Sequence, residues 1–513
     1  MKTYLKSRTP IILISLIFII MVPQTAYAHG FGTRYDLPVP LWLYMAGGGA
    51  TVTLSFLVIG LFVGRFHGEL TYRRLDLSQT PIIKALFNRY LLLVIKTTSV
   101  LLLLITIISG LAGSQEASAN LVPTLIWIIW WVGLAYVSAL VGNIWALINP
   151  WKIIYDWAEG LHFRFNVTSP LSMNLPYPEE WGVWPGVLLF IIFSWIELVF
   201  PNSADPSNLV ILALFYSAIT WFGMFLFGKD VWLNHGEAFS IAFGYLSKFA
   251  PTEVRITQPE ICQNCPVDCQ DLSGECINCY PCFSTAQGNF RQFNLRLPGA
   301  GLLRNEDVSV SSMAFVIILL STITFDGFTA TPLWADIVNA IYGGFINMTV
   351  ISTLGITTFP VLFISVYLVF SWLMAISSGN TLSVGEMASK FVYSLIPISL
   401  AYHLAHYLTF IVIQGQLIIP LTSDPLGIGW NVFGTAGYDI NISLVDARFA
   451  WFSAVTAIVT GHIIAVYLAH MMALRAIQDR MAVIRSQIPM LVLMVGYTMI
   501  SLWILAQPIV EID

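Results

Sequence analysis

The stretch YLLLVIKTTSVLLLLITIISGLA, from Tyr90 to Ala112, decides the fold class of this chain. It carries one charged side chain, Lys96, and as a helix it is long enough to cross a hydrocarbon layer about 30 Å thick. Backbone polar groups find no water inside such a layer, and a helix satisfies them within a single segment. We therefore expect a membrane-spanning helix here.

The composition extends this expectation to the whole chain. Its 513 residues are 57% hydrophobic and 10% charged, with a mean hydropathy of +0.77. Soluble domains carry about one quarter charged residues, so a soluble protein is excluded. We expect an all-α polytopic membrane protein with about ten spans, at residues 40–64, 90–112, 122–148, 182–201, 208–228, 312–330, 349–376, 388–413, 447–474 and 487–509.

The first residues have the pattern of a cleaved signal peptide. Basic residues precede the apolar run IILISLIFIIMV, and the run is followed by an A-x-A-type site ending at Ala28. Cleavage there would leave His29 as the mature amino terminus, outside the cytoplasm. The expected organisation is a signal peptide over 1–28, spans one to five over 29–228, a Cys-rich loop over 229–311 and spans six to ten over 312–513.

Basic residues gather in alternate loops and so indicate the orientation. The loops at 114–120, 201–207 and 417–446 contain no Lys or Arg. Because cytoplasmic loops are enriched in Lys and Arg, we expect both termini outside the cytoplasm. Two halves of five spans would then have opposite orientations, as in many transporters, although no sequence similarity links them. The basic residues are Arg65, Arg73, Arg74, Lys84 and Arg89 in the first loop, Lys229, Lys248, Arg255, Arg291, Arg296 and Arg304 in the fifth, and Arg475, Arg480 and Arg485 in the ninth.

The fifth loop is the one sizeable soluble segment that we expect. It begins with VWLNHGEAFSIAFGYLSKFAP, residues 231–251, which we predict to be amphipathic and to lie along the membrane surface. The loop also holds all six cysteines of the chain, which are Cys262, Cys265, Cys269, Cys276, Cys279 and Cys282. Cytoplasmic thiols stay reduced, so three structural disulfides are not expected, and close spacing points to metal ligands.

Two kinds of metal centre fit the cysteine spacing. Paired CxxC knuckles, at Cys262/Cys265 and Cys276/Cys279, are typical of a tetrahedral zinc site. The run Cys276-x2-Cys279-x2-Cys282 matches instead the first three ligands of a bacterial iron–sulfur motif, with a fourth ligand from the preceding cysteines. Both alternatives stay open at this point.

Four of the eight histidines lie in two consecutive predicted spans. His403 and His406 share one face of the eighth span, and His462 and His470 share roughly one face of the ninth. His403 and His462 fall near the middle of the membrane, where ionisable groups are costly and face the interior of a bundle. They could bind a transition metal or haem or relay protons, whereas simple hydrogen bonding between helices is the alternative. The spacing suits two stacked haems poorly.

Acidic residues and the mature terminus offer further candidates. Asp326 lies well inside an apolar run and is a candidate catalytic or ligand residue, with Glu197 and Lys96 as weaker ones. Asp424 and Asp446 are more typical of a turn residue and a helix N-cap. A mature His29 would offer an amine and an imidazole nitrogen that together suit copper, although an unconstrained chain end is the more common case.

The chain resembles a group of bacterial and archaeal polytopic membrane proteins whose members carry the label fenitrothion hydrolase. The resemblance lies in AHGFGTRYDLPVPLW, STITFDGF, AYHLAHYL, SDPLGIGWNVFGTAGY and GHIIAVYLAH. It implies a prokaryotic cytoplasmic (inner) membrane and hydrolysis of a phosphorothioate triester. Such hydrolysis calls for metal-activated water, for which His403, His406, His462 and Asp326 would be the ligands.

Three functions follow from these patterns. The first, which we favour from the sequence, is a redox or electron-transfer protein, with the cysteines as one centre and the histidines as another and with other membrane or redox subunits as partners. The second is a transporter for a transition metal or small solute, and the third is the metal-dependent hydrolase. The chain has no P-loop, dinucleotide fingerprint or serine-nucleophile elbow, and the lipid bilayer, not nucleic acid, is its expected environment.

Overall fold

The computed structural model describes residues 28–30, 33–35, 38–62, 72–165, 169–263, 269–270, 275–303, 308–343 and 346–507. The predicted signal peptide lies almost wholly outside these ranges. Side chains are described from residue 38 onward, so the predicted role of the His29 side chain also lies outside the described part. At the backbone level, His29 belongs to a two-stranded hairpin of β1 (Ala28–Gly30) and β2 (Thr33–Tyr35), in which it pairs with Arg34.

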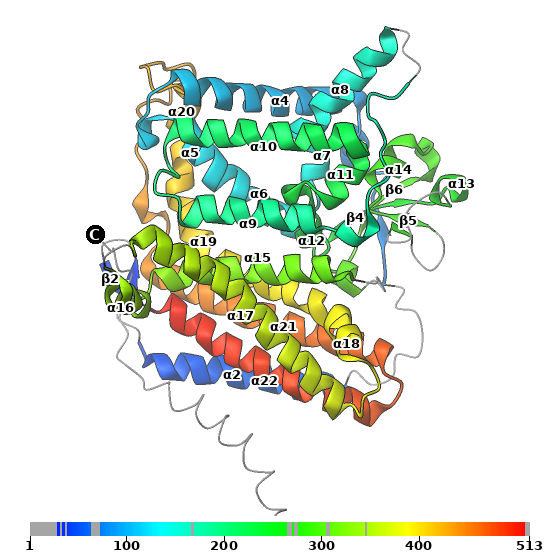
Figure 1. Ribbon diagram of the computed structural model, residues 1–513, viewed down its shortest axis with the longest axis vertical. Helices are drawn as coiled ribbons and strands as arrows, with labels where there is room; N and C mark the ends of the chain where they lie inside the picture. The colour runs from blue at the N-terminus through cyan, green and yellow to red at the C-terminus, as the bar shows by residue number, and fades with distance from the viewer. Residues whose placement is uncertain are drawn as a thin grey trace, which may run out of the picture.

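The described part of the chain has ten helical segments long and apolar enough to cross a membrane, which confirms the predicted fold class. Seven follow single helices and three consist of several helical pieces (Figure 1). The single helices are α2 (Leu41–Phe62), α4 (Arg89–Ala112), α10 (Pro206–Phe227), α15 (Val310–Thr329), α17 (Met348–Ser377), α21 (Ala447–Ala476) and α22 (Arg480–Leu505). The third span is α5 (Leu121–Pro123), the π-helix η2 (Thr124–Gly133) and α6 (Leu134–Leu140), and the fourth is η3 (Glu179–Trp181) followed by α9 (Trp184–Leu198). The eighth is α18 (Val384–Phe391), η7 (Val392–Leu395), α19 (Ile396–Ile413), η8 (Gln414–Leu417) and α20 (Ile418–Ser423).

Side-chain caps fix where several spans begin. Asp446 precedes α21 and accepts a hydrogen bond from the Phe449 amide at 2.6 Å, which confirms its predicted role as an N-cap. Asn88 caps α4 in the same way through the Tyr90 amide at 2.9 Å. Such caps satisfy amide groups that lack a partner in the first turn.

The spans pack as two bundles rather than as two halves of five. The four-span bundle contains α4, α5–η2–α6, α9 and α10 (Figure 1). The six-span bundle contains α2, α15, α17, α18–α20, α21 and α22. The first span, α2, packs against α21 and α22, so it joins the second half of the sequence.

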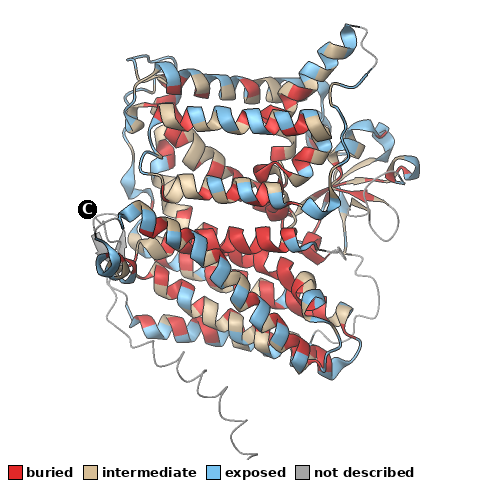
Figure 2. Cartoon of the chain, in the orientation of Figure 1, coloured by how far each residue is buried: buried red, intermediate tan, exposed pale blue. Residues whose placement is uncertain are grey.

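Helix α15 lies where the two bundles meet. It packs on α9 from the four-span bundle and on α17 and α19 from the six-span bundle. In the apolar 18-residue segment of α15, 78% of the residues are buried, a larger share than in any other described span. The helix forms a red band through the centre of Figure 2. The bundle interface is therefore the interior of this protein.

A small antiparallel sheet lies at one end of the bundles, which we call the sheet end (Figure 1). Its order is β3 (Leu75–Asp76), β6 (Arg291–Leu295), β4 (Thr252–Ile256) and β5 (Cys276–Ile277). Short helices accompany it, and the opposite or loop end carries α16, α20 and the β1–β2 hairpin. The short elements are α3 (Pro81–Leu86), η1 (Ala117–Ala119), α7 (Trp145–Ile148), α8 (Pro150–Arg164), η3 (Glu179–Trp181), α11 (Lys229–His235), α12 (Ala238–Ser247), α13 (Pro259–Cys262), α14 (Tyr280–Thr285), η5 (Gly288–Phe290), η6 (Ala300–Leu303), α16 (Pro332–Ile341) and η9 (Ile442–Leu444).

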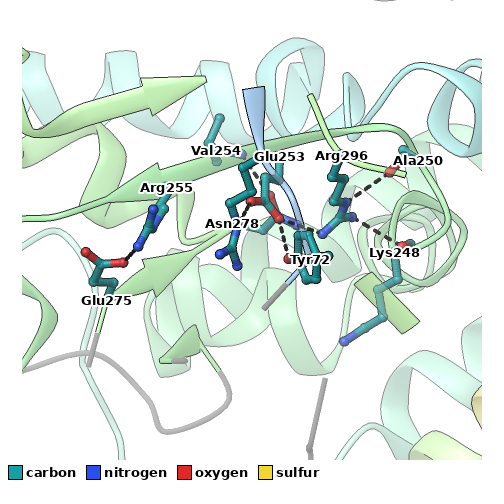
Figure 3. Close-up of polar contacts among 10 residues, drawn as sticks. Tyr72, Lys248, Ala250, Glu253, Val254, Arg255, Glu275, Asn278 and Arg296 are labelled. Atoms are coloured by element: carbon teal, nitrogen blue, oxygen red, sulfur yellow. Dashed lines mark hydrogen bonds and ion pairs between the residues drawn. The ribbon is translucent and has the colours of Figure 1, made fainter. Parts of the chain in front are cut away.

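A buried ion network ties this sheet to the bundles (Figure 3). Glu253 on β4 accepts from Arg296 at 2.9 Å, Tyr72 at 2.6 Å and Arg74 at 2.5 Å. Arg296 also donates to the carbonyls of Ala250 and Lys248, just beyond the end of α12. Burial and the neighbouring Glu253 carboxylate raise the pKa of Tyr72. The network joins the first loop, the sheet and α12 in one unit.

Helix α12 departs from the prediction that residues 231–251 lie along the membrane surface. It packs inside the protein against α6, α9, α15 and α19. Phe239 and Phe243 lie on one side of the helix, Ile241 and Tyr245 lie on the opposite side, and all four are buried. A helix that is apolar on every side is normally buried on every side. The prediction of an amphipathic surface helix was wrong because it assumed a polar face that α12 lacks.

Candidate functional site

One face of α19 carries the polar side chains that the sequence singled out in the eighth span. Ser399, Tyr402, His403, His406 and Tyr407 recur at spacings of three and four residues, so they line a single face. This face meets α15 on one side and η2 and α6 on the other. The bundle interface therefore receives most of the ionisable groups of α19.

Asp326 of α15 is the acceptor at the centre of this face. Its Oδ2 atom lies 2.8 Å from His406 Nε2 and accepts a hydrogen bond from the Tyr407 hydroxyl at 2.5 Å. The side chains of Asp326 and His406 are 21% and 22% exposed, so the protein covers the pair only in part. Asp326 and His406 were both predicted site residues, and the structure brings them into direct contact.

Glu197 of α9 adds a second carboxylate from the other bundle. It lies close enough to Asp326 for the two carboxylates to interact electrostatically, and it is partly buried. Two acids and two imidazoles thus occur within one region of low polarity, where a net negative charge is costly.

His403 points toward the four-span bundle. Its ring packs edge-on against Tyr136 at 5.0 Å and Trp131 at 6.1 Å between ring centroids, and the Tyr136 hydroxyl donates to its backbone carbonyl. The side chain is 3% exposed, and neither ring nitrogen has a hydrogen-bond partner among the residues that the structure describes. His403 is therefore a buried imidazole with unused donor and acceptor capacity beside the Asp326–His406 pair.

His462 does not join this group. Its Nδ1 atom lies 2.8 Å from the Ile458 carbonyl within α21, and its ring packs near Tyr497 of α22. The next residue back, Gly461, lies so close to α19 that a Cβ atom there would be 2.3 Å from the Ala401 Cβ. A macrocycle does not fit between α19 and α21 at this level, which disfavours a haem held jointly by His403 and His462.

The cysteines gather in a second site at the sheet end. Cys262, Cys276 and Cys279 are buried in one cluster with Ile256 and Ala286, and Cys269 and Cys282 pack against it. The Cys276 amide donates to the Cys262 sulfur at 3.1 Å, an arrangement that favours a thiolate. Contacts with the Cys269 thiol, the largest effect, lower the pKa of Cys279 to about 7.

The cysteines differ in oxidation state. Cys262, Cys269, Cys276 and Cys279 are reduced, whereas Cys282 is disulfide-bonded, which departs from the expectation that all the thiols stay reduced. Cys265 lies outside the described residues. Within the described ranges, no group of three or more His, Cys, Asp or Glu side chains is arranged to hold a metal ion. The four reduced thiols are close neighbours without metal-ligand geometry.

Other predicted and unpredicted residues have structural roles. Asp424 accepts hydrogen bonds from the Ile428 and Gly429 amides, which confirms it as a turn residue. Trp131, Tyr136 and Tyr497 were not singled out from the sequence, although each contacts a candidate histidine. Their contacts depend on packing between distant spans, so no local pattern marks them.

No family model matches the chain, and neither the curated proteins nor the solved structures contain a match. The hydrolase activity implied by the sequence resemblance stays a prediction. Its implied ligand set is divided in the structure, with Asp326, His403 and His406 at the bundle interface and His462 beyond the contact of α19 with α21.

Proposed function

We propose that this protein is a proton-coupled membrane transporter for a transition-metal cation, with Asp326 and His406 as the coupling site. The observation that carries the proposal is the Asp326 carboxylate, which accepts from His406 and Tyr407 inside a membrane-spanning bundle. A carboxylate–imidazole pair holds either a proton or a cation at modest cost, and binding of one disfavours the other. Competition of this kind is the basis of coupled exchange.

The position of the pair supports transport over a fixed structural role. Asp326 and His406 come from α15 and α19 of the six-span bundle, and Glu197 faces them from α9 of the four-span bundle. Transporters typically bind their cargo where two helical units meet, because relative movement of the units opens the site to either side. A rocking movement of the two bundles would change access to this pair.

The interrupted spans give the same indication. The third span is a π-helix over Thr124–Gly133, and the eighth is broken at Val392–Leu395 and Gln414–Leu417. Both spans line the bundle interface, and α12 enters it as a short helix. Irregular backbone at membrane depth is tolerated where it is buried in protein or lines a cavity, and it is common at transport sites.

A transition metal is the cargo that the rest of the chain suits best. Imidazole and carboxylate groups bind divalent transition metals, and thiolates bind them more tightly still. With the sheet end placed in the cytoplasm, as the basic residues predict, the four reduced thiols would receive or sense the metal after passage. Zinc is our preferred ion for these four thiols, which would have to move into tetrahedral geometry on binding it, because Cys282, the third ligand of the iron–sulfur motif, is disulfide-bonded.

The redox function predicted from the sequence depends on iron. It requires an iron–sulfur centre at the cysteines and a second redox centre at the histidines. The divided histidines and the bonded Cys282 give it less support than transport receives. It stays a prediction that a count of iron per chain decides.

The proposal is tested with the full chain in liposomes that contain a pH-sensitive dye. Zn²⁺, Co²⁺ or Mn²⁺ is added outside, and metal uptake and internal pH are followed together. We expect metal uptake with proton release for the native protein and none above protein-free liposomes for Asp326→Asn. Asp424→Asn is the matched control, because it makes the same chemical change at an exposed turn and should leave both signals unchanged. Equal signals from the native protein and Asp326→Asn would sink the proposal.

A further inference from the structure

The loop between the eighth and ninth spans contains an N-x-S/T triplet with an acidic residue two positions before the asparagine. The stretch is DINIS, from Asp439 to Ser443. N-x-S/T, with any residue except proline in the middle, is the acceptor pattern for attachment of a glycan to an asparagine side chain. Bacterial oligosaccharyltransferases also select an acidic residue at the second position before the asparagine, and Asp439 supplies it. The stretch therefore satisfies both the general and the bacterial form of the pattern.

All three side chains that a transferase would contact in this stretch are available. Asp439, Asn441 and Ser443 are each exposed. The Asn441 Oδ1 atom accepts a hydrogen bond from the Ser443 amide at 2.9 Å. Within the described part of the chain, the Asp439 carboxylate, the Asn441 Nδ2 group and the Ser443 hydroxyl have no hydrogen-bond partner. The acceptor nitrogen and both recognition groups are therefore free to bind another protein.

The backbone of Asn441 is anchored to the bundle in an extended conformation. Gln416 of η8 accepts from the Asn441 amide at 3.0 Å and donates to its carbonyl at 3.1 Å. The φ and ψ angles of Asn441 are −88° and 96°. In an extended chain, side chains two residues apart lie on one face, so Asp439 and Asn441 can be contacted together. Only the three-residue helix η9 has to open for Ser443 to join them, and such short 3₁₀ helices have weak hydrogen bonds.

The two other N-x-S/T triplets of the sequence lack this combination. Asn347, in NMT, is the N-cap of α17, and its Oδ1 atom accepts from the Val350 amide at 3.0 Å. Thr349 of this triplet is half-buried in the first turn of α17, so an extended triplet would require the span to unwind. Asn166, in NVT, lies outside the described residues. Neither triplet has an acidic residue at the second position before its asparagine.

The predicted orientation places DINIS on the side of the membrane where glycans are attached. The loop at 417–446 contains no Lys or Arg and is expected outside the cytoplasm. Prokaryotic lipid-linked glycans are presented to the transferase at the outer face of the cytoplasmic membrane. The triplet at Asn166 instead follows α8 at the sheet end, which is expected in the cytoplasm (Figure 1). Asn441 therefore combines the sequence pattern, the exposure and the sidedness of an acceptor.

We propose that Asn441 is an N-glycosylation site, to which a membrane oligosaccharyltransferase transfers an oligosaccharide from a polyprenyl-pyrophosphate carrier. The Asn441 Nδ2 atom forms a bond to C1 of the first sugar, and the bond from C1 to the pyrophosphate oxygen breaks. Nδ2 loses one proton, and the polyprenyl pyrophosphate leaves with the bonding electron pair, so nothing is oxidised or reduced. The Asp439 carboxylate pairs with a cationic side chain of the transferase, and the Ser443 hydroxyl forms a hydrogen bond in its peptide site.

The full chain in detergent, a purified bacterial oligosaccharyltransferase and an undecaprenyl-pyrophosphate-linked oligosaccharide test the site directly. Mass spectrometry of the peptides should find one glycan, on Asn441. Asn441→Gln and Ser443→Ala should abolish it and Ser443→Thr should keep it, because a site built to bind a hydroxyl rejects a side chain that lacks one. Asp439→Asn should slow the transfer by about tenfold or more, through loss of a charged hydrogen bond. Asn347→Gln is the matched control and should leave the glycan in place.

A synthetic peptide of residues 436–446 shows whether the transferase reads the stretch apart from the fold. Modification of this peptide but not of the folded chain would overturn the proposal, as would a glycan on Asn347 in place of Asn441. Co-expression of the chain with the transferase and its glycan donor in bacterial cells then tests sidedness. We expect a glycan on Asn441 and none on Asn166. A glycan on Asn166 with Asn441 unmodified would overturn both the site and the predicted orientation.

Discussion

At the scale of single residues, the hydrogen bonds of two carboxylates, Glu237 and Asp326, distinguish an acid with a structural role from a candidate functional acid. Glu237 is 0% exposed and accepts six hydrogen bonds from Tyr216, Trp145, Asn149, Ser240 and the amide of Phe239. All its acceptor capacity is used, and it caps α12. Asp326 accepts two hydrogen bonds, from His406 and Tyr407, and its side chain is partly exposed. The incompletely paired acid is therefore the one suited to exchange ligands.

A prediction at this scale concerns Arg296, which neutralises Glu253 with both side chains 0% exposed. Arg296→Met should destabilise the sheet by about 3–5 kcal/mol, because it leaves a buried carboxylate without its principal cation. Hydrogen exchange of the β4 and β6 amides measures the change. Arg255→Met on the same sheet is the control. Arg255 pairs with Glu275, and these two side chains are partly exposed, at 23% and 24%, so its loss should cost less than about 1 kcal/mol. Similar exchange in both variants would show that Arg296 does not stabilise the sheet by neutralising Glu253.

At the scale of helices, the ten spans were predictable and the interior contacts were not. An apolar run of about 20 residues determines a span almost by itself, and the predicted bounds agree with most observed helices to within a few residues. The burial of α12 and the pairing of Asp326 with His406 depend on which spans become neighbours. Residues 326 and 406 are 80 positions apart, and their contact depends on the packing of α15 against α19. Sequence periodicity marks the face of α19 but does not identify the opposing helix.

Close packing of α19 against α21 at Gly461 gives a prediction for these two elements. Gly461→Ala places a Cβ atom 2.3 Å from the Ala401 Cβ and should destabilise the bundle by about 1–3 kcal/mol. At Gly496 of α22, no atom lies within 4 Å of the point where a Cβ atom would stand, so Gly496→Ala should be neutral or stabilise by up to about 1 kcal/mol. Thermal unfolding in detergent compares the two. An unchanged midpoint for Gly461→Ala would show that the helices can separate locally at little cost.

At the scale of the whole molecule, the interface site and the thiol cluster lie in separate parts of the fold. The Asp326–His406 pair is near the loop end of α15, whereas the cysteines accompany the sheet (Figure 1). We therefore expect metal retention and metal transport to be lost by different substitutions. Elemental analysis should find about one zinc per chain, lost in Cys276→Ser and kept in Asp326→Asn. Iron at several atoms per chain would restore the redox function, and metal loss in both variants would mean that the two sites are one.

The orientation of the molecule can be tested without engineered residues, because all six cysteines lie between residues 262 and 282. The basic loops predict that this stretch is cytoplasmic. A membrane-impermeant maleimide, applied after reduction and chelation, should therefore label the protein in inside-out vesicles and leave it unlabelled in right-side-out vesicles. Permeabilised right-side-out vesicles are the control for reactivity, since their thiols should label fully. Labelling of sealed right-side-out vesicles would place the sheet end outside. The reduced thiols could then not receive metal that enters the cytoplasm, and the direction proposed for transport would be reversed.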